Sequence, residues 1–184
     1  MLATPGLTAI RDPVEGQRFL IEDALRALPF VRATDGPIVD VGSGGGSPGL
    51  PIAASLPDRR VTLLEAERRK CDFLRSFAVE LSNVEVVWGR AEEYELEQAG
   101  VALAKALAKP PVALELALPL VREGGIALLW TGASADLQAV ERAAELLAGQ
   151  LEDDEEGLLL VRKIGPTPDG FPRKPGMAKK RPLA

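Results

Sequence analysis

The sequence lacks histidine altogether and contains a single cysteine, Cys71. The first absence excludes a Ser-His-Asp triad, a Cys-His pair and most zinc sites, so we expect no metal. The second excludes an internal disulfide framework and is typical of a reducing compartment, so we expect a cytoplasmic protein. Any chemistry must therefore rely on other side chains or on the backbone.

Long apolar runs are missing as well. No stretch is apolar for long enough to span a membrane, and the N-terminus does not show the basic and then apolar segments of a secretory signal. What the sequence does have is 184 residues, of which 46% are hydrophobic. That is sufficient for one domain with a core of its own.

The charges are distributed unevenly along the chain. The segment from Arg162 to the C-terminus contains seven basic residues and one acid, a net charge of +6. Because the whole chain carries −5, the remainder carries −11. This asymmetry suggests a role for the basic segment that the acidic body does not share.

Strands and helices alternate in the pattern of the sequence. Short runs rich in Val, Ile and Leu predict strands at 37–42, 60–66, 84–89, 100–107, 124–132 and 158–164. Helical spacing or a proline start predicts helices at 12–31, 47–56, 67–81, 110–121 and 135–149, with a short helix or loop at 91–98. The acidic stretch 150–157 is expected to be a solvated loop. The alternation predicts an α/β fold, a mostly parallel sheet with helices on both faces.

We expect one domain over residues 1–164, with an N-terminal helix at about 13–30 and a core at about 37–164. Residues 165–184 are rich in Pro, Gly and basic side chains. They are expected to form a C-terminal tail that packs on the domain or extends from it.

A dense glycine cluster, in "VDVGSGGGSPGLP", follows the first predicted strand. Glycine in such number needs a reason, because it costs conformational entropy and one or two glycines are enough for a turn. In parallel sheets, ligands bind at the carboxyl ends of the strands, where this loop lies. We therefore expect a ligand to approach the backbone of the loop.

Two kinds of ligand fit the pattern of this loop. Gly44, Gly46 and Gly49 match the G-x-G-x-x-G fingerprint of dinucleotide-binding proteins, and Glu65 ends the second strand where it can bond a ribose hydroxyl. The register instead favours a D-x-G-x-G-x-G pattern, formed by Asp40, Gly42, Gly44 and Gly46. It is similar to motif I of S-adenosylmethionine (SAM) methyltransferases, and its Asp can accept hydrogen bonds from a cationic amine. A P-loop is excluded because no Lys-Ser/Thr pair follows the glycines.

Longer stretches narrow the resemblance to one family. In order, "VDVGSGGGSPGLPIA", "VTLLEAERRKCDFLR", "GRAEE", "PLVREGG" and "FPRKPGMAKKRPL" resemble the RsmG family, also called GidB. The resemblance runs from about Thr8 to the C-terminus, and the glycine loop and the "FPR" tail are its most specific parts. It implies a class I, Rossmann-like SAM-dependent methyltransferase that modifies N7 of a guanine in 16S ribosomal RNA. The implied partner is the small ribosomal subunit or its precursor.

The resemblance also implies which residues lie at the cofactor. Those positions are Gly42, Gly44, Gly46, Ser47, Glu65, Ala91 and Glu92, the last three near the adenosine. Lys105 stands where the family usually has an Arg close to SAM and substrate, so we expect it to position both. Its ammonium keeps the charge of an Arg but loses the bidentate geometry.

Other positions depart from the family pattern too. Thr131-Gly132 replaces a Lys-Gly pair after the fifth strand, and Arg18-Phe19 replaces an Arg-His pair in the first helix. The sequence begins almost at the family's "LTxIRDP" motif, without the helical segment that usually precedes it. These differences concern the acceptor and catalysis, and they affect the expected fold and SAM site little.

Methylation of guanine N7 is compatible with a chain that has no histidine. N7 carries a lone pair and no proton, so the transfer needs no general base and positioning can supply most of the rate. An RNA substrate also requires cations for its phosphates. The tail supplies the candidates Arg173, Lys174, Lys179, Lys180 and Arg181.

Three alternatives remain open on the sequence alone. The chain could be a SAM methyltransferase with a different acceptor, or a non-catalytic RNA-binding relative. It could also be an NAD-dependent oxidoreductase, which only the G-x-G-x-x-G match supports and which lacks a visible catalytic His or Tyr-Lys pair.

Overall fold

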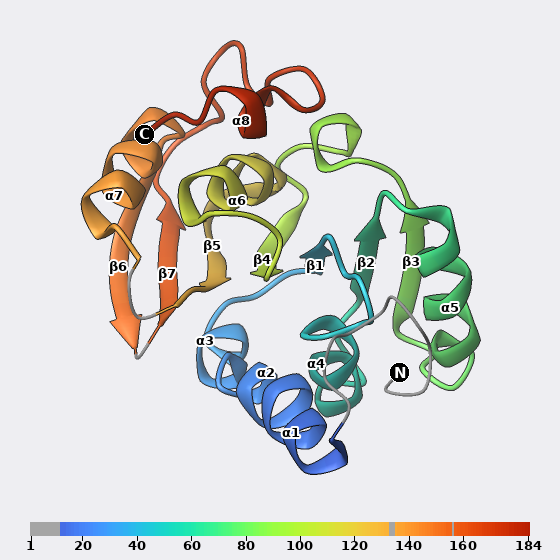
Figure 1. The fold of residues 1–184 in the computed structure, drawn as a ribbon. Coiled ribbons are helices and arrows are strands. Elements are labelled where there is room, and N and C mark those ends of the chain that lie inside the picture. The colour runs from blue at the N-terminus through green and yellow to red at the C-terminus, as the bar shows by residue number, and fades with distance from the viewer. Residues whose placement is uncertain (1–11, 133–134, 156) are drawn as a thin grey trace.

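Seven strands form one sheet in the order β3-β2-β1-β4-β5-β7-β6 (Figure 1). The computed structural model describes residues 12–132, 135–155 and 157–184, so the start of the family-like motif at residues 8–11 lies outside it. The strands are β1 (Ile38–Val41), β2 (Val61–Glu65), β3 (Val84–Trp88), β4 (Ala99–Lys105), β5 (Val121–Trp130), β6 (Gly149–Glu155) and β7 (Leu158–Lys163). β1 to β5 are parallel, and β7 runs antiparallel to β5 and β6. The predicted α/β fold with a mostly parallel sheet is confirmed.

Helices connect these strands and precede them. They are α1 (Pro13–Gln17), the π-helical turn η1 (Arg18–Glu22), α2 (Asp23–Leu25), α3 (Leu28–Arg32), α4 (Gly49–Ser55), α5 (Arg68–Ala78), the 3₁₀ turns η2 (Ala91–Glu93) and η3 (Leu118–Leu120), α6 (Pro110–Ala117), α7 (Leu137–Leu146) and α8 (Met177–Lys180). The single N-terminal helix predicted from the sequence is therefore divided into four pieces. Among the described residues, no helix is both long and apolar enough to cross a membrane.

Buried side chains on the strands alternate between two hydrophobic cores. Val39 and Val41 of β1 pack in the core that includes α6 and α7, whereas Ile38 packs in the core that includes α3 and α4. The same alternation continues through β2, β4, β5 and β7. Since both faces of the sheet are covered, the central strands read as continuous apolar runs rather than as alternating polar and apolar residues.

The prediction of a solvated loop at 150–157 was wrong. Residues up to Glu155 form β6, which pairs antiparallel with β7, for example Leu151 with Val161. The hairpin turns at Gly157, whose φ of +83° is one that side chains rarely adopt. β6 is an edge strand, and charged residues are common there because they discourage pairing with other chains. The acidic composition of this segment therefore indicated a loop, although its pairing with β7 makes it a strand.

The strand order predicts where a ligand binds. From β1 the chain adds β2 and β3 on one side and then β4 and β5 on the other side, so the sheet has a topological switch point between β1 and β4. Ligands bind outside the carboxyl ends of the strands at such a switch point. The glycine loop that follows β1 lies there.

Candidate functional site

The loop between β1 and α4 begins with a glycine that the backbone conformation favours. Gly42 has a φ of +71°, and a Cβ at this position would lie 2.4 Å from Cδ1 of Leu107, in the segment after β4. The N–H groups of Gly42 and Ser43 both donate to the carbonyl of Leu64, at 2.8 and 3.2 Å. The start of the loop is thereby fixed to the end of β2 and lies against the end of β4.

Asp40 holds the far end of the loop. Its side chain is buried, and its Oδ2 accepts a hydrogen bond from the N–H of Gly49 at 3.0 Å. A Cβ on Gly49 would lie 2.6 Å from that oxygen, so glycine is required at the start of α4. Burial raises the pKa of Asp40 to about 7.

Ser47 connects two elements near the cavity. It does not cap α4, which begins at Gly49 without a side-chain cap. The hydroxyl of Ser47 instead donates to the carbonyl of Leu20 in η1, at 2.8 Å. The widened π-helical turn offers carbonyls to partners outside the helix, and Ser47 uses one of them to connect the N-terminal helices to the glycine loop.

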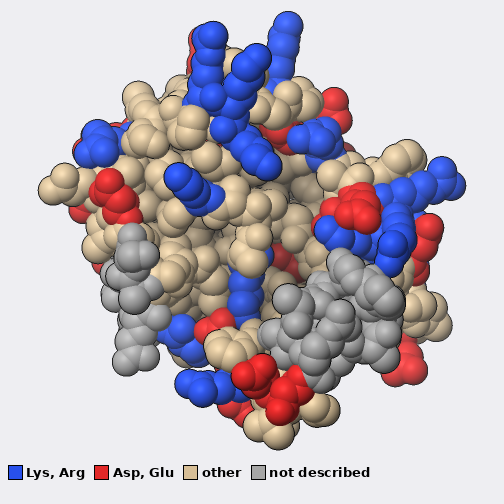
Figure 2. Space-filling view, viewed as in Figure 1, with Lys and Arg blue, Asp and Glu red and all other residues tan. Residues whose placement is uncertain are grey.

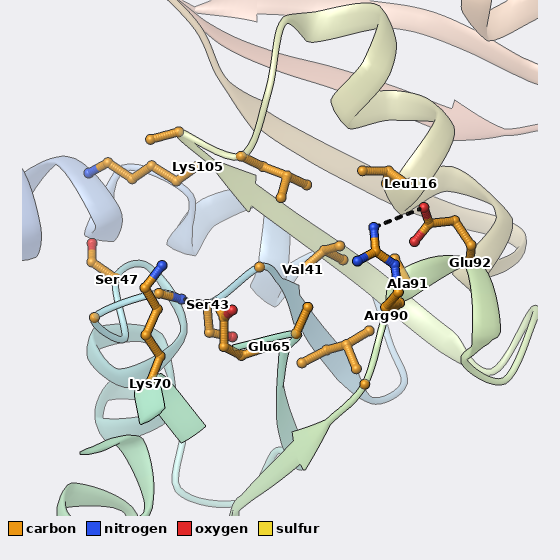
Figure 3. A pocket seen from close by; sticks show the side chains of 18 of the residues that line it. Val41, Ser43, Ser47, Glu65, Lys70, Arg90, Ala91, Glu92, Lys105 and Leu116 are labelled. Atoms are coloured by element: carbon orange, nitrogen blue, oxygen red, sulfur yellow. Dashed lines mark hydrogen bonds and ion pairs between the residues drawn. The ribbon is translucent and has the colours of Figure 1, made fainter. Parts of the chain in front are cut away.

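A cavity of about 750 Å³ opens beside this loop (Figure 3). Of the residues that the sequence singled out, it is lined by Gly42, Gly44, Ser47, Glu65, Ala91, Glu92 and Lys105. Asp40 and Gly46 do not line it, so their part is to shape the loop. Figure 3 shows an elongated arrangement, with Ser47 and Lys105 toward one end and Glu92 and Leu116 toward the other. The size suits a nucleoside-sized ligand.

Glu65 lies midway along the cavity, at the carboxyl end of β2. Its Oε2 accepts from the N–H of Gly44 and its Oε1 accepts from the N–H of Glu67, each at 2.8 Å. The two backbone donors fix the carboxylate in one orientation. Each oxygen has a second lone pair, so the carboxylate can also accept hydrogen bonds from hydroxyl groups of a ligand.

Sequence reasoning missed two basic residues of the cavity. Lys70, in the first turn of α5, forms an ion pair with Glu67 at 3.0 Å, and this hydrogen bond raises the pKa of Lys70. Arg90 precedes η2, and its Nη2 lies 3.6 Å from Oε1 of Glu92. Both residues follow the carboxyl end of a parallel strand within a few positions, which is the signal that could have identified them.

Lys105 lies at the end of the cavity that is nearest the N-terminal helices. Its Nζ is 2.6 Å from Oδ2 of Asp23 and also donates to the carbonyl of Phe19. It lies 5.9 Å from the centre of the Trp130 ring, and the indole N–H of Trp130 donates to the carbonyl of Asp23 at 3.0 Å. Lys105 therefore joins β4, β5 and the N-terminal helices at one point.

A second cavity, of about 820 Å³, adjoins the first at this point. The two share Phe19, Lys105 and Ala106 in their walls. The second cavity also contains Trp130, Asp23, Gly132 and Thr131, and Thr131 is one of the residues that depart from the family pattern. A ligand in the first cavity and a flat ring in the second could thus meet beside Lys105.

The C-terminal tail packs on the domain through a buried ion pair and hydrogen bonds. The guanidinium of Arg173 binds both carboxylate oxygens of Glu115, whose side chain is 2% exposed. Oε1 of Glu92, a residue of the cavity, accepts from the N–H of Gly176 at 2.9 Å. The tail is therefore attached to the wall of the first cavity.

Not all of the basic residues near the C-terminus are available to a partner. Lys163 is fully buried and donates to Thr167, and burial lowers its pKa. Arg162 pairs with Glu152 at 2.6 Å, and Arg173 is engaged with Glu115. The side chains that remain exposed are Lys174, Lys179, Lys180 and Arg181. Figure 2 shows Lys and Arg side chains gathered at the top of the face, where α8 lies in Figure 1.

The arrangement suits binding and positioning more than acid–base chemistry. Within the described ranges, no group of three or more His, Cys, Asp or Glu side chains could hold a metal ion. Cys71 is buried, and its Sγ lies 3.3 Å from the carbonyl of Glu65. The first cavity offers a fixed carboxylate, a backbone loop and apolar walls such as Leu107 and Leu116, a set that fits the ribose, amino-acid end and adenine of SAM.

Comparison with known proteins identifies the relatives of the chain. The GidB family model, described as rRNA small subunit methyltransferase G, matches residues 3–156. The chain is similar to the ribosomal RNA small subunit methyltransferase G of Synechococcus sp. (strain JA-2-3B'a(2-13)), with 34% identity over 98% of this chain and 79% of that protein. It is also similar to the protein of the same name from Dictyoglomus thermophilum, with 38% identity over 79% of this chain and 68% of that protein.

Solved structures show the same fold. A SAM-dependent methyltransferase from Aquifex aeolicus superposes with a TM-score of 0.65 at 15% identity, over 83% of this chain and 94% of that one. The 16S rRNA N2 G1207 methyltransferase RsmC of T. thermophilus, in complex with AdoMet and guanosine, superposes with a TM-score of 0.61 at 20% identity. The match covers 90% of this chain and 42% of that one.

Proposed function

Because this chain belongs to the GidB family, rRNA small subunit methyltransferase G, we propose that it transfers the methyl group of SAM to N7 of a guanine in 16S ribosomal RNA. SAM supplies an electrophilic methyl group on a sulfonium. The observation that carries the proposal is the pair of adjoining cavities at the carboxyl edge of the sheet, with Lys105 in the wall that they share.

We assign the first cavity to SAM. The carboxylate of Glu65 is fixed by Gly44 and Glu67 and faces the middle of the cavity, as a ribose contact requires. Ala91, Glu92 and Leu116 lie at one end, which suits the adenine. The end at Ser47 and Lys105 is left for the amino acid and the methyl group, beside the second cavity.

We assign the second cavity to the acceptor guanine. The face of Trp130 and the side chain of Phe19 offer surfaces for a planar base, and Lys105 offers a donor for O6 of the guanine, which leaves the lone pair of N7 free to react. The lone pair of N7 forms the new N–CH₃ bond while the S–CH₃ bond breaks, and no proton moves. The residues of the chain thus have to hold two partners in line, which a site without a general base can do.

We assign the exposed cations of the tail to RNA phosphates. Lys174, Lys179, Lys180 and Arg181 are exposed and lie on the segment that contacts the first cavity through Gly176 and Glu92. Arg173, also a sequence candidate for RNA binding, is bound to Glu115, so we give it the role of holding the tail in place. Phosphate contacts of this kind supply affinity without sequence preference.

A transfer assay tests the proposal. The protein is incubated with tritiated SAM and 30S subunits from a strain that lacks the family enzyme, and the labelled base is identified after digestion of the RNA. Label in 7-methylguanine is the expected result. Label in another base, or SAM binding without label in RNA, would contradict it. Calorimetric titrations with S-adenosylhomocysteine and with NAD accompany this assay. Tighter binding of NAD would favour the alternative of an NAD-dependent oxidoreductase.

A further inference from the structure

A third cavity, of about 510 Å³, continues the line of the first two. It shares Pro110 and Gly132 with the second cavity, which in turn shares Lys105 with the first. Its walls come from the N-terminal part of α6, from α7 and from Pro182 and Ala184 of the tail. The three cavities therefore form a continuous track from the proposed SAM site to the tail.

The third cavity combines an apolar floor with two cations. Pro110, Pro111 and Val112 form part of its walls, and Lys109 and Arg142 lie at its edge. Both cations are exposed, and neither forms an ion pair with any residue in the described part of the chain. Cations that have no acidic partner of their own remain available to an anionic ligand.

The acid in the wall of this cavity has a structural partner. Asp136 precedes α7, and its Oδ1 accepts from the N–H of Ala139 at 3.0 Å, which is the geometry of a helix N-cap. Its carboxylate is thus directed to the helix backbone. Together with this carboxylate, Lys109 and Arg142 give the side chains of the cavity wall a net charge of +1.

We propose that the third cavity holds the nucleotide next to the target guanine, with its base or sugar on the proline floor and its phosphate at Lys109 and Arg142. The proposal rests on the proposed function, because it extends the track from the acceptor cavity. Cations along a groove that follows the backbone are a feature by which proteins bind single-stranded nucleic acid, and here the apolar floor offers a contact surface for the base or sugar. The track also leads from the acceptor to the exposed cations of the tail, so one RNA strand can contact both.

The structure offers a matched control for the two cations. Arg60 precedes β2, so it lies at the amino edge of the sheet, opposite the cavities. It is exposed and forms no ion pair within the described residues. Arg60→Gln therefore removes the same charge as Arg142→Gln from a place that the proposed track does not reach.

The test compares Lys109→Gln, Arg142→Gln and the double variant with Arg60→Gln. Affinity for 16S ribosomal RNA is measured by filter binding between about 50 and 200 mM salt, and the slope of log K against log salt is taken. Each single substitution should reduce the slope by about 1 and the double substitution by about 2. The KM for RNA should rise, whereas kcat at saturating RNA and the affinity for S-adenosylhomocysteine should stay as in wild type.

The outcomes separate this inference from the proposed function. If the double variant binds RNA with the slope of Arg60→Gln, the third cavity is not part of the RNA track, whatever the enzyme methylates. If the wild type methylates no RNA, the proposed function fails in the transfer assay, while the binding slopes still decide whether Lys109 and Arg142 contact RNA. A fall in kcat alone would also overturn the inference, because it would indicate a role in chemistry instead of RNA contact.

Discussion

At the scale of single residues, Glu65 is the side chain on which cofactor affinity should depend most. Glu65→Gln keeps the size of the side chain but replaces one of the two acceptor oxygens by an NH2 group, which cannot accept a hydrogen bond from a backbone N–H or from a hydroxyl. We expect S-adenosylhomocysteine to bind at least ten-fold more weakly, because a hydrogen bond to a charged group contributes about 1.5–3 kcal/mol. Calorimetry measures this, with Glu80→Gln, an exposed acid just after α5, as the control. Equal affinities for the two variants would remove Glu65 from the site.

Lys105 is predicted to be a positioning residue. Lys105→Met removes the charge that pairs with Asp23 and binds the carbonyl of Phe19, so the wall between the first two cavities should loosen. We expect kcat to fall by about ten-fold or more, since misplacement of reacting groups has effects of this size, with little change in S-adenosylhomocysteine affinity.

Lys105→Arg provides the comparison for this prediction. It retains the charge, matches the residue usual in the family, and should recover most of the activity. Steady-state kinetics of RNA methylation, with kcat and KM determined separately for both variants, test the predicted loss of kcat in Lys105→Met and its recovery in Lys105→Arg. A loss of thermal stability with unchanged kcat would show that Lys105 has only a structural role.

Asp40 should make the stability of the protein depend on pH. Its folded pKa, about 7, lies above the ordinary value of 3.8 because the carboxyl is buried. The folded state therefore binds the proton more tightly than the unfolded state. The resulting stabilisation is complete below about pH 4 and is lost as the pH rises to about 7, with about 4 kcal/mol as its upper limit.

Asp40→Asn tests this directly. An amide oxygen can still accept from Gly49, but the group no longer titrates. Urea unfolding at pH 5 and pH 8 should show a smaller loss of stability toward high pH in the variant than in the wild type. The same pH dependence in both proteins would mean that the carboxyl of Asp40 titrates normally.

At the scale of elements, the tail is held to the domain by one buried ion pair. Arg173→Met leaves the carboxylate of Glu115 buried without its partner, which should cost about 3 kcal/mol of unfolding free energy. The double variant Glu115→Met/Arg173→Met should regain a large part of this loss, because no unpaired charge remains. Urea denaturation of the single and double variants measures it.

The control for the tail prediction is the exposed pair Arg162–Glu152. Arg162→Met should cost less than about 1 kcal/mol, since exposed ion pairs contribute little. If Arg173→Met behaves in the same way, the tail is attached by other contacts.

The elements also show where sequence patterns are sufficient. The strands β1, β2, β4, β5 and β7 were predicted correctly because a strand buried on both faces consists almost entirely of apolar residues. β6 was missed because an edge strand tolerates charge and is defined by its pairing with β7. The N-terminal helix was predicted as one piece, but its η1 turn widens where Phe19 and Leu20 bond to Lys105 and Ser47.

At the scale of the whole molecule, charge is separated between an acidic body and a basic edge. Lys179→Gln/Lys180→Gln should reduce the salt slope of RNA binding by about 2 and leave the affinity for S-adenosylhomocysteine unchanged. The reason is that both side chains are exposed and neither lines the SAM cavity. Filter binding and calorimetry on the same preparations check both halves, and a slope equal to that of wild type would exclude α8 from the RNA surface.

The sequence by itself determined the alternation of strands and helices, the glycine loop at the end of the first strand, and Glu65 at the end of the second. These are local signals, because apolar periodicity and backbone freedom are read within a few residues. The tertiary structure alone decided which cations are available, that Asp40 faces a helix start, and that three cavities form one track. Such facts depend on contacts between distant residues, such as Lys105 with Phe19, 86 positions apart, and Arg173 with Glu115, 58 apart. No local pattern records them, since burial and pairing arise only when the chain folds.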